Sequence, residues 1–104
     1  MDLSDIIEAI RSRRVQITRH AAQEARKDDL EIEAVADSVL GGEKIKDYPA
    51  DRPFPSCLIL GYADGRPVHS VWAFDSTAGF AVLITVYQPD PALWTTDFRR
   101  RRTE

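Results

Sequence analysis

The sequence has little cysteine and lacks long apolar runs, and each absence narrows the class of protein. Its 104 residues include one cysteine, Cys57, which has no partner for an internal disulfide and so suits a reducing compartment. No apolar stretch approaches the ~20 residues of a membrane span, and no basic segment followed by an apolar one opens the chain. We therefore expect a cytoplasmic protein without a membrane partner.

Metal-binding and cofactor-binding signals are also scarce. The chain has two histidines, His20 and His69, and no closely spaced pair of metal ligands. It lacks a glycine-rich phosphate loop, a nucleophile elbow and a CxxC motif. We predict no metal and no cofactor, and we expect Cys57 to be an inert core residue.

Basic residues are slightly fewer than acidic ones, which argues against a protein that coats nucleic acid without regard to sequence. The net charge is −3, from 14 basic and 17 acidic residues. The arginines are nevertheless clustered: Arg99–Arg102 form an unbroken run, and Arg11, Arg13, Arg14 and Arg19 lie near the start. Such clusters either meet phosphates or lie in solvent, at a helix C-terminus or in a tail. The sequence leaves both interpretations open.

The first part of the chain is helical in pattern. A single domain, residues 1–104, fits the length, since domains typically run to about 100–150 residues. Apolar and small residues recur at helical spacing over residues 4–14, 19–28 and 31–40. Thr18 can cap the second helix, and Gly41-Gly42 should end the third in the left-handed conformation. Two to three N-terminal helices are expected.

After Gly42 the pattern becomes extended. Asp64-Gly65 predicts a tight type I′ hairpin, and Pro91 after Asp90 predicts a short C-terminal helix carrying Trp94 and Phe98. Val15–Ile17 is interpreted as an extended link. The strands are predicted at Lys44–Tyr48, Ser56–Tyr62, Pro67–Phe74 and Phe80–Tyr87. The fold class is therefore α+β, with the helices packed on a three- to four-stranded antiparallel meander sheet.

The tight turns allow the strands to be aligned. The alignment places Leu60 opposite His69, and a symmetric second turn places His69 opposite Thr85 and Trp72 opposite Val82. One face then carries bulky apolar residues for the helices, including Phe80, Val82, Ile84 and Val86. The other face gathers Tyr62, His69, Thr85 and Tyr87.

This polar cluster is a candidate site, because histidine exchanges protons near neutral pH and tyrosine can donate to a developing charge. The alternative is that His69 and the tyrosines are partly buried packing residues with satisfied polar ends. His20, in the first turn of the second helix, either packs or caps there or points into the same cleft.

Four segments together resemble a bacterial family, the domain-of-unknown-function 4258 family. They are ITRHA at 17–21, YPADRPFPS at 48–56, GRPVHSV at 65–71 and ITVYQPDPALWTTDFRRR at 84–101. That family in turn resembles the RelE-like messenger-RNA interferases of bacterial toxin–antitoxin modules, which have helices on a short antiparallel sheet. The second resemblance is an analogy of fold.

The resemblance implies a metal-independent endoribonuclease, in which a 2′-hydroxyl attacks the adjacent phosphate. His69 would be the acid or base, with His20 as the alternative, and Tyr87 would donate to the phosphate. Arg99 and Arg101 would neutralise the phosphate, with Arg19 as a further nucleic-acid contact. The expected partners are RNA or the ribosome and an antitoxin-like protein. The competing hypothesis is a non-enzymatic module that binds a protein or forms a homodimer through an apolar sheet end.

Overall fold

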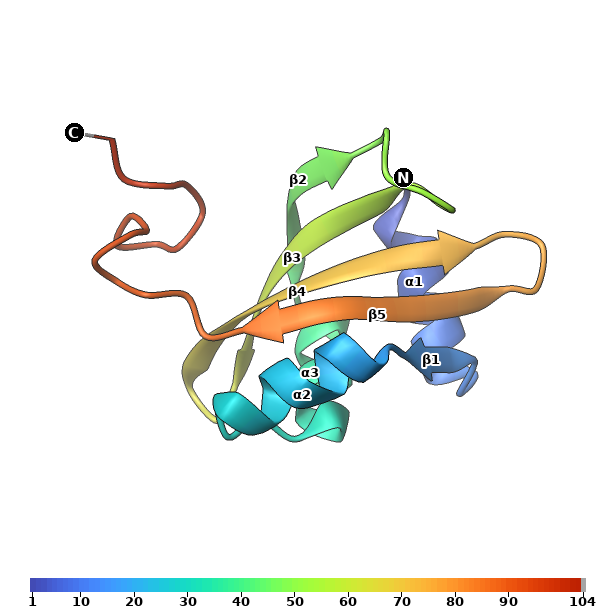
Figure 1. Ribbon diagram of the computed structural model, residues 1–104, viewed down its shortest axis with the longest axis horizontal. Helices are drawn as coiled ribbons and strands as arrows, with labels where there is room; N and C mark the ends of the chain where they lie inside the picture. Colours follow the sequence, from blue (N-terminus) through green and yellow to red (C-terminus); the bar gives the residue numbers. More distant parts are fainter. Residues whose placement is uncertain (104) are drawn as a thin grey trace.

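The computed structural model describes residues 1–103, which form three helices and a five-stranded mixed sheet (Figure 1). The strand order is β1-β5-β4-β3-β2. In chain order the elements are α1 (Leu3–Arg11), β1 (Val15–Ile17), α2 (Arg19–Lys27), α3 (Ile32–Leu40), β2 (Glu43–Tyr48), β3 (Ser56–Ala63), β4 (Arg66–Asp75) and β5 (Phe80–Tyr87). The predicted α+β class is confirmed.

The core lies between the helices and one face of the sheet. Ile6 of α1, Ala21 of α2 and Val35 of α3 are fully buried in one cluster with Trp72 of β4 and Leu83 of β5. Ala21 and Ala25, two small residues of α2, are buried in this cluster. Among the described residues, no helix combines the length and apolar character that crossing a membrane requires.

The helix starts follow from local capping. The Thr18 hydroxyl accepts a hydrogen bond from the backbone N–H of Ala21 at 3.0 Å, and the Asp2 carboxylate accepts one from Ser4 at 3.0 Å. The end of α3 is predicted at the right place for the wrong reason. Gly41 has a φ of −109° and not a left-handed one. Glycine is required at the next position because a Cβ on Gly42 would lie 2.9 Å from the backbone oxygens of Leu60 and Ser38.

The predicted three- to four-stranded antiparallel sheet is wrong in one respect, because a fifth strand joins it in parallel. Val15–Ile17, expected as a link, pairs with Ala81–Leu83 of β5. The backbone groups of this three-residue segment form their hydrogen bonds with a strand 66 residues further along the chain. Nothing in so short a run specifies which distant edge it meets.

The first hairpin has the predicted register. Leu60 lies opposite His69 and Leu58 opposite Val71, around a turn in which Asp64 and Gly65 have φ of 52° and 76°. These two positive φ values are those that a type I′ turn requires.

The predicted register of the second hairpin is wrong. Trp72 pairs with Leu83, and His69 pairs with Tyr87 rather than with Thr85. The turn is one residue shorter than assumed, with Asp75 opposite Phe80, and a β-bulge follows where Ile84 is the extra residue. As a result Ala81 and Leu83 enter the core in place of the expected Phe80, Val82 and Ile84, whereas Val86 is buried as predicted.

Two hydrogen bonds from Thr18 accompany this bulge. Its backbone N–H donates to the Leu83 carbonyl at 3.1 Å, and its hydroxyl donates to the Ile84 carbonyl at 3.0 Å. The junction between β1 and α2 therefore holds two successive carbonyls of β5. The sequence around β5 alone contains no sign of this contact.

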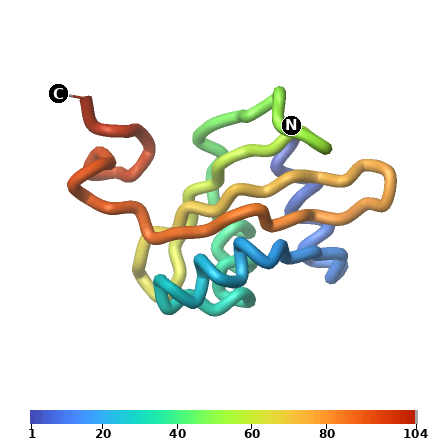
Figure 2. Tube along the Cα trace, viewed as in Figure 1, coloured from blue at the N-terminus to red at the C-terminus, as the bar shows by residue number. Residues whose placement is uncertain are grey.

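The predicted C-terminal helix does not form. Residues 89–103, the C-terminal arm, make a single turn after Asp90 and then a small hairpin, with Trp94 bridged to Arg101 in antiparallel fashion. The Asp97 carboxylate accepts hydrogen bonds from the Thr95 hydroxyl and the Arg99 N–H, and such local bonds compete with helix formation. The arm leaves the end of β5 and loops at that end of the sheet (Figure 2).

Candidate functional site

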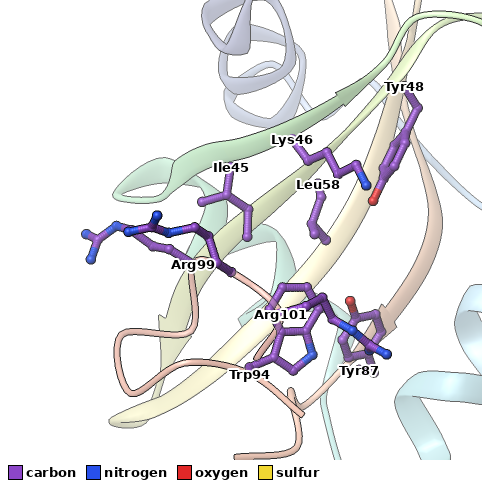
Figure 3. Close-up of a pocket in the computed structure, with 9 residues that line it drawn as sticks. Ile45, Lys46, Tyr48, Leu58, Tyr87, Trp94, Arg99 and Arg101 are labelled. Atoms are coloured by element: carbon purple, nitrogen blue, oxygen red, sulfur yellow. The ribbon is translucent and has the colours of Figure 1, made fainter. Parts of the chain in front are cut away.

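A pocket of about 480 Å³ lies between the C-terminal arm and the sheet face opposite the helices (Figure 3). β2 supplies one wall, β3 and β5 supply the floor, and the arm closes the other side. The lining residues are Ile45, Lys46, Tyr48, Leu58, Tyr87, Trp94, Arg99, Arg100 and Arg101. Four cations and three aromatic rings thus meet in one cavity of a chain whose net charge is −3.

Strand register brings the β2 side chains to this face. Lys46 pairs with Leu58 and Tyr48 pairs with Ser56, so alternation points both toward the pocket. A bulge between Lys44 and Lys46 lets Ile45 face the same way. The Lys46 ammonium lies 5.6 Å from the centre of the Tyr48 ring, within range of a cation–π interaction.

Arg99 and Arg101 of the arm make different contacts. Arg99 forms hydrogen bonds to both carboxylate oxygens of Glu43 on β2, at 2.8–3.0 Å, and an ion pair with Asp97. The hydrogen bonds from Arg99 lower the pKa of Glu43, so this carboxylate stays ionised. Arg101 instead stacks over the Trp94 ring at 5.5 Å, with its guanidinium at the pocket (Figure 3).

His69 lies directly beneath this pocket and is fully buried. Its Nδ1 is 3.2 Å from the Tyr87 hydroxyl, and its Nε2 is 2.8 Å from the Phe98 carbonyl oxygen. Trp94 meets the imidazole edge-on, with ring centroids 4.3 Å apart. The ring therefore joins β4, β5 and the arm.

Burial determines the ionisation states of His69 and Tyr87. Desolvation lowers the pKa of His69, and the bond to the Phe98 carbonyl only partly opposes it, which favours the neutral ring. Desolvation also raises the pKa of Tyr87, with a contribution from nearby Tyr48 and an opposing one from Arg101. Both side chains are thus held in their neutral forms near neutral pH.

The structure brings some of the sequence-predicted residues together and separates others. Tyr87, Arg99 and Arg101 line the pocket, and His69 lies under Tyr87. His20 is exposed on α2, where its Nε2 lies 3.2 Å from the Thr85 hydroxyl, and Arg19 is exposed beside it. The expected cluster of four side chains is therefore divided, with Thr85 at His20 and Tyr87 at His69.

Sequence reasoning missed Lys46, Tyr48, Trp94 and Arg100 as lining residues. Lys46 and Tyr48 stand two apart on a predicted edge strand, and that spacing alone would have put them on one face. Trp94 was placed on a predicted C-terminal helix, whereas in the structure it is 8% exposed and lines the pocket. Cys57 is buried on the helix-facing side as expected, and desolvation raises the pKa of its thiol to about 11.

Comparison with known families identifies the chain at the level of its family. The model of the family described as "Domain of unknown function (DUF4258)" matches residues 17–88, which is more than half of the chain, so the protein belongs to this family. The match includes Lys46, Tyr48, His69 and Tyr87 and ends before the C-terminal arm. No curated protein and no solved structure matches the chain.

Proposed function

We propose that this domain binds single-stranded RNA in the pocket beneath the C-terminal arm and cleaves it without a metal ion. In this proposal it is a toxin-like component of a bacterial toxin–antitoxin module, acting in the cytoplasm on free or ribosome-bound message. The observation that carries the proposal is the convergence of cations and aromatic rings in one cavity.

The cations supply the phosphate contacts. Lys46, Arg100 and Arg101 enter the pocket from β2 and the arm, on opposite sides. A phosphate between them would meet positive charge from both sides, and guanidinium groups match phosphate oxygens in pairs. Arg99 adds charge at the rim, although Glu43 neutralises part of it.

The aromatic rings supply the contacts to bases. Tyr48, Tyr87 and Trp94 line the same cavity as these cations, and the Tyr48 and Tyr87 rings lie on opposite sides of it (Figure 3). Aromatic stacking contributes about 1–3 kcal/mol per base to the binding of single strands. Stacked bases in a duplex cannot present their faces to these rings, which favours an unpaired strand.

The chemistry follows from the groups that face the ligand. Cleavage by the 2′-hydroxyl needs a proton acceptor for that hydroxyl, a proton donor for the leaving oxygen, and positive charge at the phosphate. Tyr87 and Lys46 can exchange protons with a bound strand, and Arg101 can stabilise the phosphate. This route requires RNA, since DNA lacks the attacking hydroxyl.

The alternative, a non-enzymatic binding or homodimerising module, has weaker support. Large exposed apolar side chains in the described part of the chain are Tyr62, 55% exposed, and Leu93, 47% exposed. They belong to β3 and to the arm and do not form a patch of the size that marks interfaces. Sedimentation at low and high protein concentration tests self-association.

The test uses a labelled single-stranded RNA of mixed sequence and a DNA of the same sequence, with a chelator present. We expect saturable RNA binding by fluorescence anisotropy, weakened by Lys46→Ala and Arg101→Ala and unchanged by Arg26→Ala, a matched loss of charge on the exposed end of α2. Cleavage of RNA but not of DNA should leave 2′,3′-cyclic phosphate ends. Equal affinity of all four proteins, or RNA left intact both free and on ribosomes, contradicts the proposal.

A further inference from the structure

A chain of hydrogen bonds runs from Tyr87 at the pocket through the buried His69 ring to the backbone of the C-terminal arm. The Phe98 carbonyl oxygen lies 2.8 Å from His69 Nε2, and His69 Nδ1 lies 3.2 Å from the Tyr87 hydroxyl. A carbonyl oxygen can only accept a hydrogen bond, so Nε2 carries the hydrogen. In the neutral ring Nδ1 is then an acceptor, and the Tyr87 hydroxyl donates to it.

His69 and Tyr87 differ in their access to the pocket. His69 is 0% exposed, with Trp94 against its edge and Leu60 opposite it on β3, so no substrate atom reaches the ring. Tyr87 is half-buried and lines the pocket. Any proton that His69 takes from a ligand must therefore pass through the Tyr87 oxygen.

We propose that His69 is a positioning residue that accepts the substrate's proton through Tyr87, with its tautomer fixed by the backbone carbonyl of Phe98. This inference rests on the proposed function, because the proton comes from the attacking 2′-hydroxyl of RNA. The arm thus contributes more than arginines to the site, since its backbone selects which imidazole nitrogen is free to act.

Two proton transfers accompany the attack on the phosphate. The O2′–H bond breaks and its proton passes to the Tyr87 oxygen, while the Tyr87 hydroxyl proton passes to His69 Nδ1. The O2′–P bond forms and the P–O5′ bond breaks, and the Lys46 ammonium supplies the proton that O5′ takes up. The products are a 2′,3′-cyclic phosphate and a 5′-hydroxyl, and His69 and Lys46 then re-equilibrate their protons with water.

Charged side chains line the pocket above His69 and affect the proton transfer through Tyr87. Lys46 of β2 and Arg99, Arg100 and Arg101 of the arm line the pocket above it, and Tyr48 and Tyr87 are the titratable groups that face one another there. Burial of His69 favours its neutral ring before reaction, and the cations stabilise negative charge on Tyr87 and on the phosphate during it. Glu43 and Asp97 are acidic groups at the rim, and both are paired with Arg99.

Single-turnover cleavage of the labelled RNA as a function of pH tests the relay, together with ¹⁵N NMR of the two histidines. We expect the wild type to show the Nε2–H tautomer at His69 and a rate that falls as His69 is protonated. His69→Gln keeps a donor for Phe98 but cannot take up a proton. It should lower the rate about 100-fold and abolish the acidic limb of the profile. Tyr87→Phe should do the same and shift the His69 Nδ1 resonance.

Tyr62→Phe is the matched control, because Tyr62 is a solvent-exposed tyrosine of β3 that does not line the pocket. It should leave rate, profile and the His69 resonances unchanged. If His69→Gln lowers the rate equally at every pH, His69 is merely structural and the relay is wrong. Should His69→Gln fail to fold, the profile of Tyr87→Phe decides, and an unchanged acidic limb there overturns the relay. RNA left intact by the wild type overturns the proposed function itself, and the relay with it.

Discussion

The imidazole of His69, on β4, is hydrogen-bonded to the main-chain carbonyl of Phe98 in the C-terminal arm, at 2.8 Å. Phe98 adopts a φ of 61°, an uncommon conformation for an aromatic residue, and this conformation accompanies the turn of the arm over the ring. The contact connects the family-matched part of the chain to a segment beyond it. It makes the pocket a product of both segments, and it leads to predictions about how the arm is held.

Burial of Trp94 should be the main apolar anchor of the arm. Trp94→Ala removes a nearly buried ring that contacts His69, and we expect a loss of about 3 kcal/mol in the free energy of unfolding. Leu93→Ala, at an exposed neighbouring position, should change it by no more than about 0.5 kcal/mol. Urea unfolding followed by circular dichroism measures both. Equal effects of the two substitutions would show that the arm is not anchored through Trp94.

Stability should rise with pH through the range in which His69 titrates. Its pKa in the folded state is lowered, so the unfolded chain binds the proton more readily. The stabilisation is complete above the unfolded-state pKa and is lost as pH falls through that value toward the folded-state pKa. We expect a lower urea midpoint at about pH 5.5 than at about pH 7.5. His69→Gln should flatten this difference, and an equally steep dependence in the variant would contradict the assignment.

Gly61 should tolerate no side chain, because α3 crosses β3 there. A Cβ at this position would lie 2.2 Å from the Ser38 carbonyl oxygen, a backbone atom that cannot move aside as a flexible side chain can. Gly61→Ala should therefore cost about 3 kcal/mol or more of unfolding free energy. Gly41→Ala is the matched control, since nothing lies within 4 Å of a Cβ there and its φ is −109°. It should be neutral or stabilise by roughly 0.5 kcal/mol. Thermal unfolding of both variants checks the pair.

The exit of β5 should be held by Asp28, just after α2. The carboxylate of Asp28 accepts a hydrogen bond from the backbone N–H of Gln88 at 2.8 Å. Asp28→Ala leaves this amide without its partner, and we expect a loss of about 1 kcal/mol in stability. Hydrogen exchange at the Gln88 amide should accelerate at the same time. Asp37→Ala, at an exposed position on α3, serves as the control, and similar exchange in both variants would contradict the contact.

Under the proposed function, Glu43 should weaken RNA binding, because it neutralises Arg99 at the rim of the pocket. Glu43→Gln should tighten binding by roughly two- to fivefold at low salt, and the gain should shrink as salt screens the site. Glu33→Gln makes the same charge change on α3, away from the pocket, and should have little effect. Equal gains in the two variants would show that net charge and not the site governs affinity.

Local signals in the sequence were sufficient for the parts of the fold that depend on nearby residues. Thr18 caps α2 because its hydroxyl meets an amide three residues on, and Asp64-Gly65 sets the first hairpin because the two residues accept positive φ. The register of the first hairpin, and with it the position of His69 on the face away from the helices, follows from that turn.

The second register needed tertiary information. The contact that accompanies the bulge at Ile84 comes from Thr18, 66 residues away in the sequence, and no local pattern in β5 encodes it. The shorter second turn and the bulge each shift the register by one residue, so His69 pairs with Tyr87 and not with Thr85. The strand Val15–Ile17 became part of the sheet for the same kind of reason, since its partner is distant.

The sequence by itself determined the helix periods, the tight turn and the alternation of faces, because each rests on a repeat or a backbone preference within a few residues. Only the tertiary structure decided which side chains share the pocket. In the sequence, Arg99–Arg102 fit both a solvated tail and a set of phosphate contacts. Burial of Trp94 and the bond from His69 to Phe98 fold Arg99–Arg101 over Lys46 and Tyr87, and such long-range contacts have no signature within any one segment.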